Sequence, residues 1–142
     1  MKCPLTIIVP VLVLSTGVMA IAEEDSRQSV ELPEMMEQHM MSNMRNHLAA
    51  INEILASLAN DRLEQAADIA ESQLGMSSLE MHEASHMAEF MPKGMRQAGM
   101  SMHRAASRFA LKAQEGDVLA AYAALSEITS ACVNCHSQYR VR

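Results

Sequence analysis

Apolar side chains recur at steps of three and four residues along most of the chain, the period of an amphipathic helix. The first such stretch begins at Leu32-Pro33-Glu34, where a proline in the first helical turn loses no hydrogen bond, and it predicts a helix that ends near Ala59. Its predicted apolar stripe consists of Met36, Met40, Met44, His47, Ile51, Ile54 and Leu58, and the residues predicted to face away are Asn43, Arg45, Asn46, Asn52 and Glu53.

Two further long helices are predicted in the middle of the chain. The second runs over 62–74, with Asn60 and Asp61 as possible caps and Gly75 as a left-handed stop. Ser77 opens a capping box that starts a short helix to about Phe90, and Pro92 then begins a third long helix that ends at Gly116. The inward positions are Leu63, Ala66, Ala67 and Ala70 in the second helix, and Met95, Gly99, Met102, Ala106, Phe109 and Ala113 in the third.

Asp117 is placed to cap the last long helix, which extends nearly to the end of the sequence. Its predicted stripe is Val118, Tyr122, Leu125, Thr129, Cys132 and His136. Because no segment alternates with period two, we expect an all-α fold, most simply an antiparallel four-helix bundle over 33–142. The polar, aperiodic stretch 23–32 is expected to be a flexible N-terminal extension.

The first 22 residues have the features of a cleaved signal peptide. Lys2 gives a positive start, an apolar run too short to span a bilayer follows, and Ala20-Ile21-Ala22 forms a small-x-small cleavage site before Glu23. The alternative is an uncleaved anchor. We therefore expect an exported, periplasmic protein without stable membrane insertion, from which Cys3 is removed with the signal.

The charge and composition narrow the possible functions. The chain has 17 acidic and 11 basic residues, a formal net charge of −6, and loss of Lys2 with the signal makes the mature chain more acidic. This balance argues against nucleic-acid binding. The scarcity of aromatic residues favours helices over a β-sandwich, whereas the fourteen Met residues are an unexplained excess.

The pair of cysteines left in the mature chain lies in the sequence Cys132-Val133-Asn134-Cys135-His136, the C-x-x-C-H pattern of covalent haem attachment. Positions i, i+3 and i+4 share one face of a helix, so two thioether bonds to haem vinyl groups can form while the imidazole reaches the iron. We expect one covalent haem c, tethered by Cys132 and Cys135, with His136 as the proximal iron ligand.

Two other interpretations of the cysteine pair are a redox-active dithiol and half of a zinc site. A thioredoxin-type dithiol opens a helix after a strand, whereas Cys132 and Cys135 lie near the end of a predicted helix. A zinc site needs further thiolates, which the mature chain lacks.

A four-helix chain with C-x-x-C-H in its last helix, continuing His136-Ser137-Gln138-Tyr139-Arg140, resembles the class II c-type cytochromes, the cytochrome c prime group. The resemblance covers most of the mature chain in helix order, and its specific motif is confined to 132–140. It implies a periplasmic monohaem protein, not an enzyme, that transfers single electrons to redox partner proteins or binds small gases such as nitric oxide or carbon monoxide. Homodimers through the first two helices are common in that family.

The resemblance also implies a place for the residue on the other side of the iron. The family's distal position falls near Met44, and a thioether there would give six-coordinate iron with a raised potential. Met40 and His47, one turn away on the same stripe, are the alternatives, together with an open distal site.

A second motif and its surroundings suggest other metals. His82-Glu83-Ala84-Ser85-His86 spells the zinc-protease pattern H-E-x-x-H, but so small a domain offers little room for a substrate cleft, and we expect a surface-facing helical His pair. Soft thioethers and imidazoles also cluster between 81 and 103, as a copper(I)-binding bundle would present them. They are Met81, Met87, Met91, Met95, Met100, Met102 and His103.

Arg104, Arg108 and Lys112 form a basic stripe at four-residue steps on an acidic protein. Such a stripe is usually a solvated helix face. It could also dock an acidic redox partner or approach the haem propionates.

Overall fold

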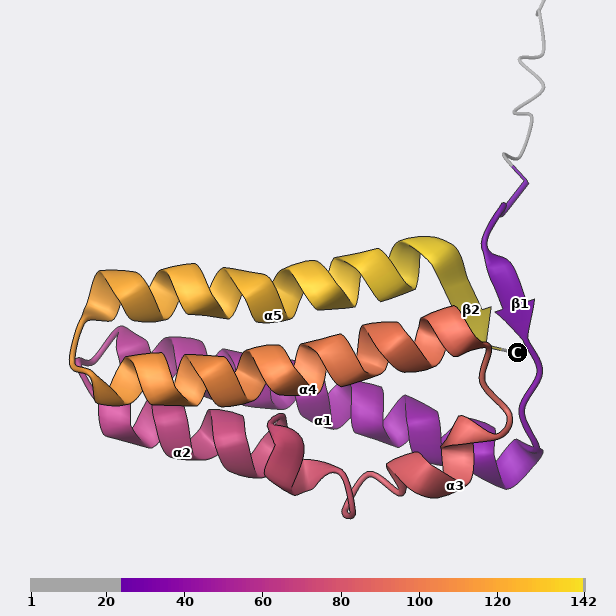
Figure 1. The fold of residues 1–142 in the computed structure, drawn as a ribbon, viewed down its shortest axis with the longest axis horizontal. Coiled ribbons are helices and arrows are strands. Elements are labelled where there is room, and N and C mark those ends of the chain that lie inside the picture. Colours follow the sequence, from indigo (N-terminus) through magenta and orange to yellow (C-terminus); the bar gives the residue numbers. More distant parts are fainter. Residues whose placement is uncertain (1–23, 142) are drawn as a thin grey trace, which may run out of the picture.

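The computed structural model describes residues 24–141, and the predicted signal peptide, 1–22, lies outside them. Apart from two three-residue strands, the secondary structure of the described chain is helical, which confirms the all-α class (Figure 1). The elements are β1 (Gln28–Val30), α1 (Glu34–Leu58), α2 (Leu63–Gln73), the 3₁₀ turn η1 (Met76–Ser78), α3 (Ala84–Ala88), α4 (Lys93–Gln114), α5 (Val118–Gln138) and β2 (Tyr139–Val141). The four longer helices run lengthwise beside one another, with α3, β1 and β2 at one end (Figure 1).

Three helix starts agree with the local signals in the sequence. Pro33 and Pro92 directly precede α1 and α4 with φ of −53° and −55°, the angle that the proline ring imposes and a helix requires. Asp117 caps α5, because its side chain accepts hydrogen bonds from the backbone N–H groups of Leu119 (2.9 Å) and Ala120 (3.1 Å). Gly116, at φ +83°, supplies the left-handed turn between α4 and α5.

Two local predictions are wrong. Gly75 is extended rather than left-handed, with φ −71° and ψ −174°, because its N–H still donates to the Ala70 carbonyl at the end of α2. The short helix predicted to run from Ser77 to Phe90 forms only over Ala84–Ala88. Glu83 adopts the left-handed conformation, φ +49°, and separates this helix from the turns before it.

The main hydrophobic core lies between the four longer helices. α4 packs against both α2 and α5, and α1 packs against α2. Phe109 of α4 is fully buried at the centre of this core, and most of the side chains around it are small. Alanines contributed by all four helices are buried there, and they let the helix backbones approach closely: Ala50, Ala66, Ala67, Ala70, Ala105, Ala106, Ala110, Ala113 and Ala121.

The predicted stripe of α5 is rotated relative to the observed one. The buried residues are Ala121, Leu125 and Ile128, whereas Tyr122 and Thr129 are exposed. A small side chain at 121 lets α5 lie close to α4, and the Tyr122 ring would hold the two helices apart. By length and composition, α5 is the one described helix that could cross a membrane, but its inner face packs on the main core.

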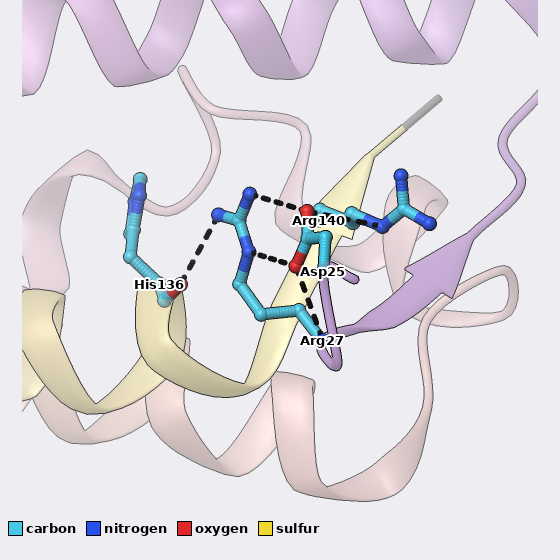
Figure 2. A network of polar contacts seen from close by, with 4 residues as sticks. All are labelled: Asp25, Arg27, His136 and Arg140. Carbon is cyan, nitrogen blue, oxygen red and sulfur yellow. Dashed lines mark hydrogen bonds and ion pairs between the residues drawn. The ribbon is translucent and has the colours of Figure 1, made fainter. Parts of the chain in front are cut away.

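The segment expected to be a flexible extension is ordered over its described part. β1 pairs in parallel with β2, with Val30 opposite Val141, and both Val30 and Leu32 are buried. Arg27 donates a hydrogen bond to the His136 carbonyl (3.3 Å) and forms an ion pair with Asp25 (Figure 2). The prediction failed because this order comes from contacts with the far end of the chain and not from any local periodicity.

Candidate functional site

A cavity of about 890 Å³ lies at the end of the molecule where β1, β2 and α3 gather. Its walls come from α1, from the segment 79–91, from the first half of α4 and from the junction of α5 with β2. A volume of this size is typical of a site for a large organic ligand or cofactor, for which cavities are about 300–1,000 Å³.

Methionines supply much of the apolar wall of this cavity. They come from three separate parts of the chain, and several also form a second hydrophobic cluster with Val30 and Leu32. The thioether is flexible and polarizable, so it suits a surface that must fit a bulky ligand. This gives a place to much of the methionine excess: the lining residues are Met40, Met41, Met44, Met87, Met91, Met95, Met100 and Met102.

The C-x-x-C-H residues lie at the edge of this cavity, in the last two turns of α5. Cys135 and His136 line the cavity, whereas Cys132, one turn earlier, packs against the main core. His136 is exposed and both cysteines are half-buried. Neither Cys132 nor Cys135 forms a disulfide bond, so both sulfur atoms are free for another covalent bond.

The environment of the two thiols does not favour a redox-active dithiol. Burial raises the pKa of Cys132, and burial together with the neighbouring Cys132 raises the pKa of Cys135. A nucleophilic thiol requires the opposite, a lowered pKa beside a cation or a helix N-terminus. The raised pKa values of both thiols therefore argue against a redox-active dithiol.

The three residues considered for the distal side of the iron all line the same cavity as Cys135 and His136. Met40 is buried, and Met44 and His47 are half-buried. Asn43, which was predicted to face away from this stripe, is instead buried and donates a hydrogen bond to the His82 carbonyl (3.2 Å). The segment 79–83 therefore packs over α1 and covers a face that the periodicity left polar.

Basic side chains surround the cavity, although the protein as a whole is acidic. Five of its lining residues are cationic and none is acidic: Arg27, Lys93, Arg96, Arg104 and Arg140. Arg96 is fixed by hydrogen bonds to the carbonyls of Ala88 (3.0 Å) and Met91 (2.8 Å), and Arg140 Nε lies 3.5 Å from Asp25. Such a lining favours an anionic ligand.

The predicted basic stripe on α4 divides in two. Arg104 belongs to the cavity, whereas Arg108 pairs with Glu127 (2.7 Å) and Lys112 pairs with Glu115 (2.9 Å) on an exposed face. Of the three residues of this stripe, Arg104 alone can contact a ligand in the cavity.

The H-E-x-x-H segment does not form the predicted surface pair of histidines. His82 is buried and only His86 is exposed, because Glu83 in the left-handed conformation interrupts the helix between them. A zinc protease needs both imidazoles on the same face of one helix. The proteolytic interpretation thus lacks its geometric basis in this structure.

His82 instead meets two histidines that are distant in sequence. Its ring centre lies 4.7 Å from that of His47 and 5.5 Å from that of His103, and the remaining pair is 6.0 Å apart. As the side chains stand, no group of three His, Cys, Asp or Glu residues in the described chain could hold a metal ion. The sequence grouped His82 and His103 with the methionines of 81–103 as copper(I) candidates, but no local pattern linked His47 to them, because the three histidines come from separate elements.

The sequence comparisons place no known protein beside this one. The chain matches no family model, no curated protein and no solved structure.

Proposed function

We propose that this protein is an exported monohaem c-type cytochrome, an antiparallel four-helix bundle that transfers single electrons. The observation that carries the proposal is one cavity that Cys135, His136, Met44 and five basic side chains share. Its volume suits a large flat ligand, its walls are mostly thioether and its cations match a ligand with carboxylates.

The residues present fit a covalently bound haem. Cys132 and Cys135 would tether it and His136 would bind its iron, as the C-x-x-C-H pattern implies. Cys132 packs against the main core and Cys135 lines the cavity. When bound, the haem supplies the one-electron chemistry, and the protein tunes it through ligation, burial and charge.

The basic residues have a defined task in this proposal. Two propionates per haem bring negative charge to the cavity, and Arg side chains bind carboxylates through two parallel hydrogen bonds. Arg104 of α4 is our first proposed donor, because it lines the cavity on the exposed side of the helix. Arg96 and Arg140 line the cavity as well, but Arg96 already donates to two backbone carbonyls and Arg140 lies 3.5 Å from Asp25. Their positive charge also favours the reduced, less positive iron and raises the potential.

Met44 is our proposed sixth ligand, which suits electron transfer because a thioether raises the potential. Met40 and His47 line the same cavity and remain the alternatives. A gas-binding protein with an open distal site is the second candidate function, since eight methionines can also exclude water around a free coordination position. The same proposal includes export to the periplasm, redox partner proteins and a homodimer.

The optical spectrum of the protein tests it. The full chain is produced in bacteria that have the periplasmic haem-attachment machinery, and covalently bound haem is measured after denaturation. We expect one haem per chain, sharp low-spin bands on reduction and no change with carbon monoxide. A broad high-spin band that shifts with the gas would replace electron transfer by gas binding, and a colourless protein would refute the haem proposal.

Two variants define the attachment site. Cys135→Ala should leave at most one thioether and shift the reduced bands, and Cys132→Ala with Cys135→Ala should leave no covalent haem. Met81→Leu is the matched control, because Met81 is 60% exposed and does not line the cavity. Covalent haem that survives the double change would overturn the assignment of the tether.

A further inference from the structure

Three histidines from separate elements form one wall of the cavity: His47 from α1, His82 from the turns before α3 and His103 from α4. His82 and His103 are buried and His47 is half-buried. Burial lowers the pKa of all three, and the pKa of His47 falls to about 4. A neutral imidazole has one nitrogen with a free lone pair.

Hydrogen bonds determine which nitrogen that is in two of the rings. His103 Nδ1 lies 2.7 Å from the Leu74 carbonyl, which only accepts, so Nδ1 holds the proton. Ser78 donates its single hydroxyl proton to the Gly75 carbonyl (2.8 Å), so His82 Nδ1, 3.3 Å away, donates to the Ser78 oxygen. Both rings consequently keep Nε2 unprotonated, with Nδ1–H held by a backbone carbonyl or a hydroxyl. Histidines that bind metals are held in the same way.

The third ring has an unexplained buried atom. His47 Nε2 is inaccessible to water and has no hydrogen-bond partner. A buried polar atom without a partner costs about 1–3 kcal/mol, so such atoms are rare unless a ligand satisfies them. The trio therefore combines two lone pairs and one unsatisfied nitrogen in the same wall.

The ring spacing suits a single metal ion. With a metal–nitrogen distance of about 2.0–2.1 Å, the centres of imidazoles bound to one tetrahedral ion lie about 5 Å apart. The observed separations of 4.7, 5.5 and 6.0 Å lie around that value. The three nitrogens do not yet converge. Closure of the site therefore requires a change in the side-chain torsions of the three histidines.

We propose that His47, His82 and His103 bind one copper(I) ion. Neutral imidazoles add no negative charge and the cavity has cationic residues and no acidic ones, so a singly charged ion is favoured over a doubly charged one. The thioethers of Met100 and Met102 line the same cavity, and soft sulfur ligands select copper(I). This site goes beyond the haem function and does not depend on it. The proposed copper(I) ligands differ from the group of Met and His residues expected from the sequence. Met81 of that group is exposed, and His47 of α1 is added.

Anaerobic titration tests the proposal. Copper(I) is added to the purified haem-loaded full-length protein, or to the protein as purified if it has no haem, in competition with a chromogenic copper(I) chelator. We expect one ion per chain. His47→Gln, His82→Gln and His103→Gln should each weaken binding at least tenfold, while His86→Gln, an exposed histidine of the same segment, should bind as the unchanged protein does.

A gentler variant keeps the test valid if a histidine change prevents folding. Ser78→Ala removes the acceptor that positions His82, and loss of such a partner weakens metal binding about 10–100-fold. Copper-edge X-ray absorption should show imidazole nitrogen as the main ligand and should lose part of that signal in His103→Gln.

Three outcomes would overturn the copper(I) site. They are no stoichiometric uptake, equal loss in His86→Gln, or a preference for Zn²⁺ added alone at the same concentration. Haem content is measured separately by optical absorption, so failure of the copper site and failure of the haem proposal give different results.

Discussion

Arg27 donates a hydrogen bond to the carbonyl oxygen of His136, across 3.3 Å and 109 residues of sequence. The same guanidinium pairs with Asp25, whose carboxylate lies 3.5 Å from Arg140 (Figure 2). Arg27 thereby holds the pKa of the Asp25 carboxyl well below its usual range. The N-terminal segment is thus joined to the turn of α5 that contains the C-x-x-C-H histidine, and Arg27, directly before β1, lines the cavity.

Replacing Val30 tests whether β1 packs in solution. Val30→Ala should lower the free energy of unfolding by about 1–3 kcal/mol, because Val30 is 4% exposed and packs in the methionine cluster. Ser29→Ala, on the exposed side of the same strand, should change it by less than about 0.5 kcal/mol. Urea unfolding of both variants makes the measurement, and equal effects would show that the strand is not held.

The main core should depend most strongly on Phe109. Phe109→Ala should cost about 3–5 kcal/mol, because the ring is fully buried among alanines that cannot collapse to fill its space. Leu111→Ala, at a site 64% exposed on the same helix, should cost less than about 0.5 kcal/mol. If the two variants unfold at the same urea concentration, the core is not centred on Phe109.

The stability of the protein without bound copper should rise with pH between about 4 and 6.5. The folded protein lowers the pKa of His47 to about 4, so in this window the unfolded chain binds more protons. The stabilisation is present above pH 6.5 and is lost as the pH falls, by about 3 kcal/mol for His47 alone. Unfolding measured across this range should be flatter in His47→Gln, and an unchanged slope would contradict the buried neutral state.

Met44→Ala should convert the iron of the haem protein from low-spin to high-spin, because the proposed sixth ligand is removed. The reduced spectrum should broaden and become sensitive to carbon monoxide. Met35→Ala is the control, since Met35 lies on the same helix but is 76% exposed. An unchanged spectrum in Met44→Ala would show that Met44 is not the sixth ligand and would leave His47 and Met40 as the candidates.

Two glycines of α4 should respond differently to alanine. A Cβ at Gly94 would collide with the Tyr139 hydroxyl, whereas a Cβ at Gly99 would meet no atom within 4 Å. Gly99→Ala should therefore stabilise the helix by about 0.5–1 kcal/mol, and Gly94→Ala should gain less and move the Tyr139 ring. Tyrosine NMR signals and urea unfolding distinguish the two results, and a Tyr139 signal that does not move would deny the close approach.

Local signals in the sequence predicted much of the fold. Pro33, Pro92 and Asp117 begin helices where expected, because each acts through its own backbone angle or its own side chain. The periodicity also located Ile54, Leu58 and Phe109 in the core. The periodicity predicted the wrong face of α5, because apolar residues occupy more than one face of this helix. Packing against α4 buries Ala121 and leaves Tyr122 exposed.

The candidate site was predictable only in part. The spacing of Cys135 and His136 and the stripe that contains Met44 indicated residues that do line one cavity. Arg104 was one of the basic residues considered for the haem propionates, and it does line the cavity. The other basic lining residues and the place of His47 beside His82 and His103 were missed, because these residues come from elements that meet only after folding. Glu83 is the sharpest case: its left-handed backbone turns His82 inward, and nothing in H-E-x-x-H signals that change.

The parallel pairing of β1 with β2 also sets an order of assembly. Among the described elements β1 is the first and β2 the last, so their pairing closes a loop that contains all the described helices and forms late. The helices can pack around Phe109 before this end of the molecule shuts. If the protein binds the haem that we propose, this cofactor can enter while this end of the molecule is still open, before the two strands pair.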